Sequence, residues 1–375
     1  MVGENDLDVA YRKAVEVLKI CSTKYGLFAS GGKKGYKGVW SRDSFIAMLG
    51  ASLVGGEDGE LIRETFKRSL ETLGKYQSER GQIPNAVLKF ERRKPQVDYL
   101  SIDSSLWFVI GHYVYRRRYR DSSLFGKWKK EIEKAIFWLT FQDMGEDLML
   151  EQLPTTDWQD AFPHKYGRTI NTQALYYKVL RLVGRRRIAR RLRKLVNKED
   201  DVNLWNGNFY WAYRWKNHNK YREIGEWFDS LGNLLAIVFG LADRKMARKI
   251  VSYIEENRIA EPYPVKAIFP TIKRGSKYWQ DYYMDCAAGK AGHYLNGGIW
   301  PFIGGFYVLA LVKLRKFGEA EVELRKLASS CLRGNVFPEW IEPKTKKTHG
   351  VYQAWSAGMY ILAHESLKRR RVLIF

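Results

Sequence analysis

The sequence predicts an all-α fold in which six helical hairpins close into an (α/α)6 barrel, or toroid. Apolar residues recur every three or four positions through almost all of the 375 residues, which is the period of an amphipathic helix. Strictly alternating apolar and polar runs, the pattern of half-buried strands, are scarce. Tight joints connect consecutive helices, and longer connections fall after alternate hairpins.

The periodicity predicts twelve helices. The third is typical, because Phe66, Leu70 and Leu73 are spaced to lie on one face. In chain order the expected helices span residues 6–24, 42–54, 60–78, 102–119, 124–142, 170–184, 186–197, 230–240, 243–256, 298–315, 317–332 and 353–370.

Cap and turn residues mark the joints between these helices. Residues 55–59, rich in glycine, separate the second helix from the third, and Gly184 separates the sixth from the seventh. Asp243 begins the ninth helix, and Phe317-Gly318 begins the eleventh. Twelve helices paired in this way make six hairpins, whose closed arrangement is a toroid. Since no change of composition marks a boundary, we expect one domain over residues 1–375.

Composition excludes several classes of protein. Hydrophobic residues make up 45% of the chain, enough for a core, so intrinsic disorder is excluded. No apolar run approaches the roughly 18 residues of a membrane-spanning helix, and the N-terminus is acidic and polar, so we expect a soluble, cytoplasmic protein without a membrane partner. Cys21, Cys286 and Cys331 lie far apart and form no zinc-binding pattern. Neither a metal nor a cofactor is expected.

The net charge of +23 raises the question of a nucleic-acid partner. The positive charge is concentrated in residues 116–120, 185–194 and 368–371, each at the end of an apolar-periodic segment. Cations are favoured at helix C-termini by the macrodipole. We therefore favour solvated helix ends over a nucleic-acid groove.

The long connections have the composition of a binding site. They span residues 81–99, 144–168, 202–228, 258–297 and 334–352. They carry many of the 13 tryptophans beside Asp, Glu and Gly. Indole rings stack on the C–H faces of sugars while carboxylates bind the hydroxyl groups, and loops at one end of a rigid scaffold are where sites are built. A carbohydrate is therefore the expected substrate.

Four clusters place carboxyl groups next to aromatic residues. They are Trp40-Ser41-Arg42-Asp43, residues 102–107 around Asp103, residues 156–160 around Trp158, and Phe337-Pro338-Glu339-Trp340. Hydrolysis of a glycoside needs one protonated and one ionised carboxyl group. Asp160 and Glu339 are candidates for these two groups, because their connections are separated by half of the ring of helices. Asp43 and Asp103 stand where helices begin, so helix capping competes with a binding role for both.

Other chemistries are less well supported. The glycine-rich loop at residues 31–35 lacks the spacing of a phosphate-binding loop. The six histidines form no HExxH pair, and His293 alone is expected near the pocket. Asp281 and Asp285 are spaced to bind a cation, but a solvated face is the simpler interpretation.

At these clusters the sequence resembles the six-hairpin glycosidases, most of all the amylo-α-1,6-glucosidase group, with neutral invertases and trehalases as more distant relatives. The resemblance runs in order over nearly the whole chain. Its motifs are residues 40–43, 81–85, 103–108, 157–161 with 173–177 behind it, 296–301, 338–340 and 353–358.

The resemblance implies roles for individual residues. Asp160 matches the general acid and Glu339 the general base, while Arg42, Asp43 and Asp103 match residues that hold the sugar. The chain has Asp157-Trp158-Gln159 where the family usually has Thr-Trp-Met, so Asp157 is a rival for the acid. Debranching glucosidases tend to carry a further N-terminal domain, and its lack here favours a short oligosaccharide or a small glycoside.

We therefore expect an inverting hydrolase of an α-glucosidic bond, with its two carboxyl groups about 6.5 to 9.5 Å apart. Besides Arg42, Asp43, Asp103 and Asp157, the residues expected to bind the sugar are Trp40, Trp107, Trp158, Gln173, His293, Asn296, Trp300 and Trp340. Three alternatives stay open at this point. They are a hydrolase of an anionic glycoside such as a glucosyl- or mannosyl-glycerate, a sugar epimerase on the same fold, and a non-catalytic carbohydrate-binding or nucleic-acid-associated protein.

Overall fold

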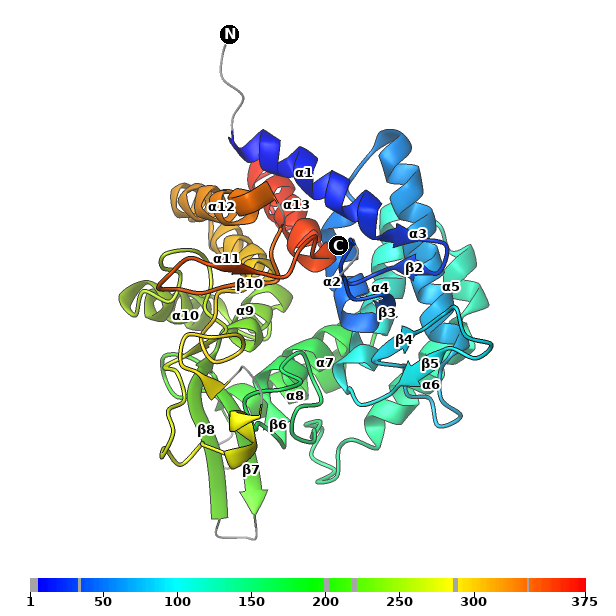
Figure 1. Cartoon of the computed structure of the whole chain (residues 1–375). Coiled ribbons are helices and arrows are strands. Elements are labelled where there is room, and N and C mark those ends of the chain that lie inside the picture. Colours follow the sequence, from blue (N-terminus) through cyan, green and yellow to red (C-terminus); the bar gives the residue numbers. More distant parts are fainter. Residues whose placement is uncertain (1–5, 33–34, 199–201, 218–220, 286–288, 336) are drawn as a thin grey trace.

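Helices dominate the structure, as the periodicity predicted. The computed structural model describes residues 6–32, 35–198, 202–217, 221–285, 289–335 and 337–375. These residues form thirteen α-helices and four small sheets (Figure 1). None of the helices in the described part of the chain is long and apolar enough to cross a membrane. Cys21 and Cys331 are buried free thiols, and Cys286 lies outside the described residues.

Six helices contact one another in a closed cycle. Following the cycle, they are α2 (Ser41–Ala51), α4 (Asp103–Tyr119), α7 (Ile170–Leu182), α9 (Ser230–Phe239), α11 (Pro301–Leu314) and α13 (Ala354–Lys368), which returns to α2. Every residue of α2 and α9 is buried. A helix that is apolar on all sides is stable only when neighbours cover it all round, and the closed cycle provides that cover.

Seven further helices pack on the outside of this cycle. They are α1 (Asp6–Cys21), α3 (Gly56–Lys75), α5 (Ser123–Lys127), α6 (Lys129–Thr140), α8 (Arg186–Lys198), α10 (Arg244–Glu256) and α12 (Phe317–Leu332). Helix α3 contacts α2 and α4, α8 contacts α7, and α12 contacts α11 and α13. Their apolar residues face the inner helices and their charged residues face solvent.

The expected helix at residues 124–142 is two helices in the structure. Trp128 has non-helical backbone angles and separates α5 from α6. Its indole ring lies against Gly74, where an added Cβ would come within 2.7 Å of the ring. The helix expected from residue 298 begins at Pro301, because Trp300 is extended and proline suits the first helical position.

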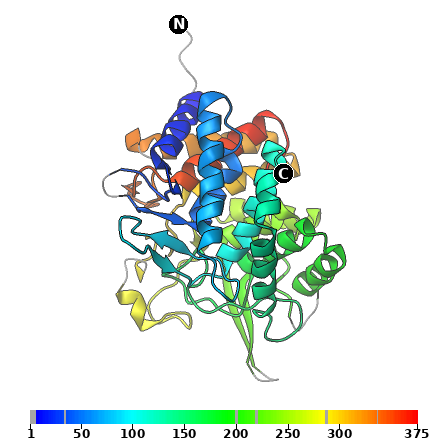
Figure 2. The same ribbon diagram turned by 90° about the vertical axis from the view of Figure 1, so that its right-hand side faces the viewer.

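The long connections contain strands, so the all-α prediction was too narrow. One sheet joins β3 (Gly38–Trp40), β4 (Ala86–Leu88) and β5 (Gln96–Asp98), and another has the order β6 (Arg168–Thr169), β7 (Trp211–Asn217), β8 (Tyr221–Asp229) and β9 (Ile268–Phe269). Two-stranded pairs are formed by β1 (Ser22–Thr23) with β2 (Gly26–Leu27) and by β10 (Trp340–Ile341) with β11 (Thr348–His349). The hairpin of β7 and β8 projects from the helices in both views (Figures 1 and 2). Strict alternation is absent from β7, because Tyr213 and Arg214 are both buried and the pairing with β8 shifts register between Trp211 and Tyr213. Arg214 donates to the Asn203 carbonyl at 2.9 Å.

The course of the chain gathers these connections at one end of the helical cycle. Each inner helix is entered from a long connection, and a short joint then leads from α2, α4, α7, α9 and α11 into an outer helix. All six inner helices therefore run in one direction. Their N-termini and the long connections lie together, where a binding site is built most readily.

Candidate active site

A pocket opens where the inner helices begin. It has an empty volume of about 480 Å³ and is open to solvent. Its lining comes from six separate parts of the chain: Ala29, Tyr36, Trp40, Arg42, Asp43, Trp158, Asp160, Tyr294, Trp300, Glu339 and Trp355. Seven of the residues expected at the site therefore line one pocket.

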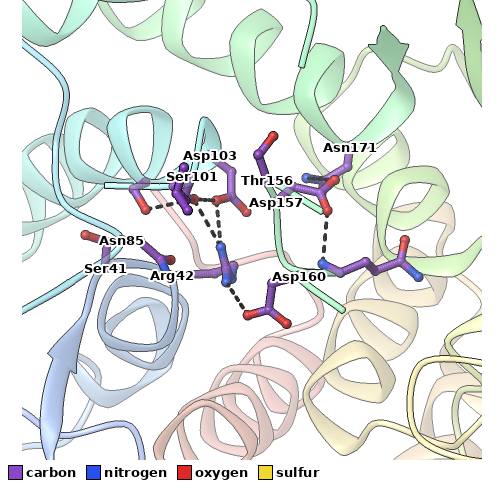
Figure 3. Close-up of polar contacts among 12 residues, drawn as sticks. Ser41, Arg42, Asn85, Ser101, Asp103, Thr156, Asp157, Asp160 and Asn171 are labelled. Atoms are coloured by element: carbon purple, nitrogen blue, oxygen red, sulfur yellow. Dashed lines mark hydrogen bonds and ion pairs between the residues drawn. The ribbon is translucent and has the colours of Figure 1, made fainter. Parts of the chain in front are cut away.

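Arg42 is the central cation of this pocket. It lies in the first turn of α2 with 3% of its surface exposed. Its guanidinium group donates to Asp103 at 2.8 Å and to Ser101 at 3.2 Å, and reaches Asp160 at 3.5 Å (Figure 3). Asp103 is fully buried and does not line the pocket. Asp103 therefore holds Arg42, and Arg42 in turn lies against Asp160.

Asp43 is a buried carboxyl group in the first turn of α2. Burial raises its pKa to about 7, with a further contribution from Asp160, while Arg42 opposes the rise. Helix capping, the competing role for Asp43 and Asp103, is not what either residue does. The cap positions are Trp40 and Ile102, and neither forms a capping hydrogen bond.

Glu339 is half-buried and lines the same pocket, in the connection before α13. Burial raises its pKa to about 8, and the neighbouring charges of Asp43 and Asp160 raise it further. A hydrogen bond with Tyr36 lowers it in part. Three carboxyl groups therefore share one pocket and compete for protons.

Asp160 differs from Glu339 in its surroundings. Burial within the pocket raises its pKa, and the positive charge of Arg42 lowers it. Although the carboxyl group is enclosed by the pocket walls, 42% of the side-chain surface remains exposed. Solvent or a ligand can reach it directly.

Asp157, the rival of Asp160, lies in a separate ion-pair cluster. Its carboxylate lies 2.9 Å from Lys165, and the same ammonium group lies 2.7 Å from Asp229. All three side chains are fully buried. Asp157 also accepts the backbone N–H of Gln159 at 2.9 Å and does not line the pocket. Its carboxylate therefore holds the loop that presents Asp160.

Aromatic rings form the walls of the pocket. Trp158 meets Trp300 edge to face at 5.7 Å, and Tyr294 lies 5.2 Å from Trp300. Trp158 and Trp300 are 2% and 1% exposed, so little of either ring is accessible to solvent. Tyr36, at 49%, is the most accessible aromatic side chain of the lining.

Two residues expected to bind the sugar lie in the packed interior. Trp107 is 1% exposed, and its ring packs against Phe239 at 6.2 Å. Gln173 is fully buried on α7 and donates to the Leu150 carbonyl at 2.6 Å. Neither lines the pocket, because Trp107 packs among the helices and Gln173 binds the backbone of the connection before α7.

Three others stabilise the loop between β9 and α11. Asn296 is fully buried and exchanges two hydrogen bonds with the Ile272 backbone, at 2.9 and 2.8 Å. His293 packs against Trp340 at 4.4 Å, and Trp340 stacks on His349 at 3.9 Å. These residues lie behind Tyr294 and Glu339 and do not line the pocket.

Comparisons with known proteins agree with this geometry. The family model of amylo-alpha-1,6-glucosidase matches residues 12–190, and that of alkaline and neutral invertase matches residues 222–370. Each model covers less than half of the chain, and together they support the six-hairpin glycosidase superfamily. Among curated relatives, neutral/alkaline invertase 1 of Oryza sativa subsp. japonica is 29% identical over 141 residues, and alkaline/neutral invertase C of Arabidopsis thaliana is 24% identical over 148 residues. These matches cover 36% and 38% of this chain but only 22% of each relative.

Solved glycosidase structures share the fold over nearly the whole chain. The GH63 mannosylglycerate hydrolase from Thermus thermophilus, in complex with glucose, superposes with a TM-score of 0.67 at 14% identity and covers 94% of this chain and 99% of its own. A glutamate-to-alanine variant of another glycosidase, also in complex with glucose, has a TM-score of 0.66 at 16% identity, with 97% of each chain covered.

Sequence reasoning did not identify four residues that line this pocket. Trp355 lies in the motif at residues 353–358, but the sequence suggests no individual role for it. Tyr36 follows the glycine-rich loop at residues 31–35, which lacks the spacing of a phosphate-binding loop. Residues 33–34 of that loop lie outside the described part of the chain. Tyr294 and Ala29 carry no local signal. The described residues also contain no group of three or more His, Cys, Asp and Glu side chains suited to a metal ion.

Proposed function

We propose that the protein is an inverting glycoside hydrolase on an (α/α)6 barrel, a single domain over residues 1–375 that cleaves an α-glucosidic bond in a short oligosaccharide or small glycoside. One observation carries the proposal. Asp160 and Glu339 come from connections on opposite sides of the helical cycle and line the same small pocket. A pair of carboxyl groups across a sugar-sized pocket is what glycoside hydrolysis needs.

In the proposed reaction, Asp160 donates a proton to the glycosidic oxygen as the bond to the anomeric carbon breaks. Glu339 takes a proton from a water molecule, whose oxygen attacks that carbon from the opposite face. Asp160 fits the acid because its carboxyl group is accessible within the pocket and burial raises its pKa. Asp157 is less suited, because Lys165 and the Gln159 backbone engage its carboxylate.

The charge of the pocket favours a neutral sugar over an anionic glycoside. Three carboxyl groups line it, namely Asp43, Asp160 and Glu339, against one cation. That cation, Arg42, already lies against Asp103 and Asp160. A substrate carboxylate within this pocket would face net negative charge. No histidine is among the described lining residues, which also disfavours an epimerase that uses histidines as acid and base.

The stereochemistry of the product tests the proposal. Proton NMR of the anomeric signals is expected to show β-glucose as the first product released from an α-linked disaccharide panel of maltose, isomaltose, trehalose and sucrose. Because spontaneous mutarotation is slow relative to a fast enzymatic reaction, spectra taken in the first minutes report the enzyme. First release of α-glucose would replace the inverting mechanism with a retaining one.

The pH dependence of kcat/KM tests whether Asp160 and Glu339 share one proton in the active enzyme. The active form of the pair carries one proton, on Asp160, with Glu339 ionised. Because the two groups titrate together, this form disappears when the pair loses its last proton, near the raised pKa of about 8 of Glu339, and no acid then remains. We expect kcat/KM to fall above that pH. Tyr36→Phe removes a hydrogen bond that lowers the pKa of Glu339, so the alkaline limb should move to higher pH by up to about one unit.

Tyr113→Phe is the matched control for this measurement, because Tyr113 lies on α4 and packs against Phe125 away from the pocket. Its profile should superimpose on that of the wild type. If the alkaline limb of kcat/KM does not shift in Tyr36→Phe, that limb does not report the pKa of Glu339.

A further inference from the structure

A second cavity lies at the end of the helical cycle where the inner helices finish. Val238 and Phe239 at the end of α9, and Val312 and Lys313 near the end of α11, contribute to its lining. Helix α11 begins beside Trp300 of the active-site pocket, so Lys313 lies roughly 18 Å farther along the same helix. Figure 2 places the C-terminus, which also lines this cavity, on the side of the molecule away from the connection that carries β4 and β5.

The cavity combines positive charge with apolar walls. It has an empty volume of about 1030 Å³ and is open to solvent. Its cationic lining residues are Lys178, Lys313, Arg315, Arg370 and Arg371. Its apolar lining residues are Val238, Phe239, Val312, Phe317, Val372, Ile374 and Phe375. No Asp or Glu side chain is among the described lining residues.

Capping of helix C-termini explains one of these cations and leaves the others unexplained. Lys313 donates to the carbonyl groups of Ile237 and Val238 at 2.6 and 2.9 Å, which satisfies the end of α9. The side chains of the other four donate no hydrogen bond and form no ion pair within the described part of the chain. Of these four, Lys178 is half-buried, while Arg315, Arg370 and Arg371 are exposed, so their guanidinium groups are accessible to a ligand.

The pKa values of the two lysines are lowered in this arrangement. Burial lowers the pKa of Lys178 to about 8, and Arg181, Lys313 and Arg117 lower it further. Burial and neighbouring arginines likewise lower the pKa of Lys313 to about 8. Both groups would gain an opposite charge if an anion were bound between them.

Aromatic rings lie directly against these cations. The ammonium group of Lys178 is 3.6 Å from the centroid of Phe375, and the guanidinium group of Arg370 is 5.3 Å from that of Phe317. The C-terminal segment is fixed in place, because Arg118 of α4 donates to the Leu373 carbonyl at 2.6 Å and Leu373 is buried. The cavity wall is therefore ordered around cations that pair with no Asp or Glu side chain of the described residues.

We propose that this cavity binds an organic phosphate, a ligand with a phosphate group for the cations and a flat apolar body for the aromatic wall. The phosphate would lie between Lys178 and Arg371, and the apolar body against Phe317 and Phe375. Arginine and lysine side chains form strong, charge-assisted hydrogen bonds to phosphate oxygens. This site is distinct from the proposed catalytic pocket and does not depend on the hydrolase function.

Isothermal titration calorimetry at pH 7 and low salt tests the proposal with phenyl phosphate, inorganic phosphate and phenol as probes. Wild-type protein should bind phenyl phosphate more tightly than inorganic phosphate, and should not bind phenol. The double variant Lys178→Met/Arg371→Gln should weaken phenyl phosphate binding by about tenfold or more. Loss of Lys178 removes an unpaired, partly buried cation, so this variant should fold at least as stably as the wild type.

Arg186→Gln/Arg190→Gln is the matched control. It removes the same net charge from exposed positions of α8 that do not line the cavity, and it should change phenyl phosphate affinity less than about twofold. Phe317→Leu should weaken phenyl phosphate binding while inorganic phosphate binding stays unchanged.

Three results would overturn the proposal. The first is no phenyl phosphate binding by the wild type at millimolar concentration. The second is an equal loss of affinity in the double variant and its control. The third is binding of a short single-stranded oligonucleotide that both double variants weaken alike and that phenyl phosphate does not displace, which would make this face a nucleic-acid surface.

Discussion

Replacing Glu339 by glutamine is expected to lower kcat for hydrolysis by about a thousandfold, because an amide cannot take the proton from the attacking water. Asp160→Asn should lower kcat on natural glycosides by a similar factor. The two variants should differ on α-glucosyl fluoride, whose leaving group needs no protonation. There Asp160→Asn should stay within about tenfold of the wild type, while Glu339→Gln should remain inactive.

Two control variants make this test specific. Glu342→Gln changes a carboxyl group of the same connection that binds His349 and Thr345 outside the pocket, and should leave kcat unchanged. Asp157→Asn tests the rival acid. If Asp157→Asn instead of Asp160→Asn were the variant rescued by the fluoride substrate, the acid would be Asp157.

The second large effect concerns stability. Lys165→Met should lower the free energy of unfolding by about 3–5 kcal/mol, measured by urea denaturation at pH 7, because it leaves the carboxylates of Asp157 and Asp229 buried without a cation. Asp229 also caps α9 by accepting the Gly232 N–H at 3.1 Å, so the beginning of an inner helix is coupled to this cluster.

The adjacent carboxylate provides an internal control. Lys165→Met/Asp157→Asn removes one of the two unpaired charges and should recover part of the loss. Lys277→Met breaks an ion pair of 2.6 Å with Glu226 whose two side chains are more than half exposed, and should cost less than about 1 kcal/mol. Equal losses in Lys165→Met and Lys277→Met would contradict the assigned role of the buried cluster.

The basic segments of the sequence have a structural explanation that their composition only partly indicated. Arg116 to Arg118 end α4 and residues 369–371 follow α13, as expected for cations at helix C-termini. Residues 186–194 differ from the expectation, because they form the first turns of α8 and not the end of a helix, and most of their arginines are solvated on its exposed face. The closed cycle then brings the ends of α7, α9, α11 and α13 to one cavity. Cations at the ends of several helices therefore line the same cavity.

Periodicity and local motifs predict the helices and the connections in which the pocket residues lie. Periodicity identified every inner helix to within a few residues, because a helix covered on all sides must be apolar along its whole length. Arg42, Asp43, Asp160 and Glu339 were recognisable because each stands beside a tryptophan or another motif residue in a polar connection. Strands were missed where buried polar residues such as Arg214 interrupt the alternation.

Which carboxyl groups share the pocket depends on long-range contacts that no local motif reveals. Asp157 and Asp160 are three residues apart and chemically alike, yet Lys165 and Asp229 enclose the first while the second faces solvent. Trp107 and Trp158 stand in similar motifs, yet only Trp158 lines the pocket. Such differences depend on burial and on ion pairs between residues far apart in the chain. The local sequence does not predict these differences in burial and ion pairing, because they arise when the helical cycle closes.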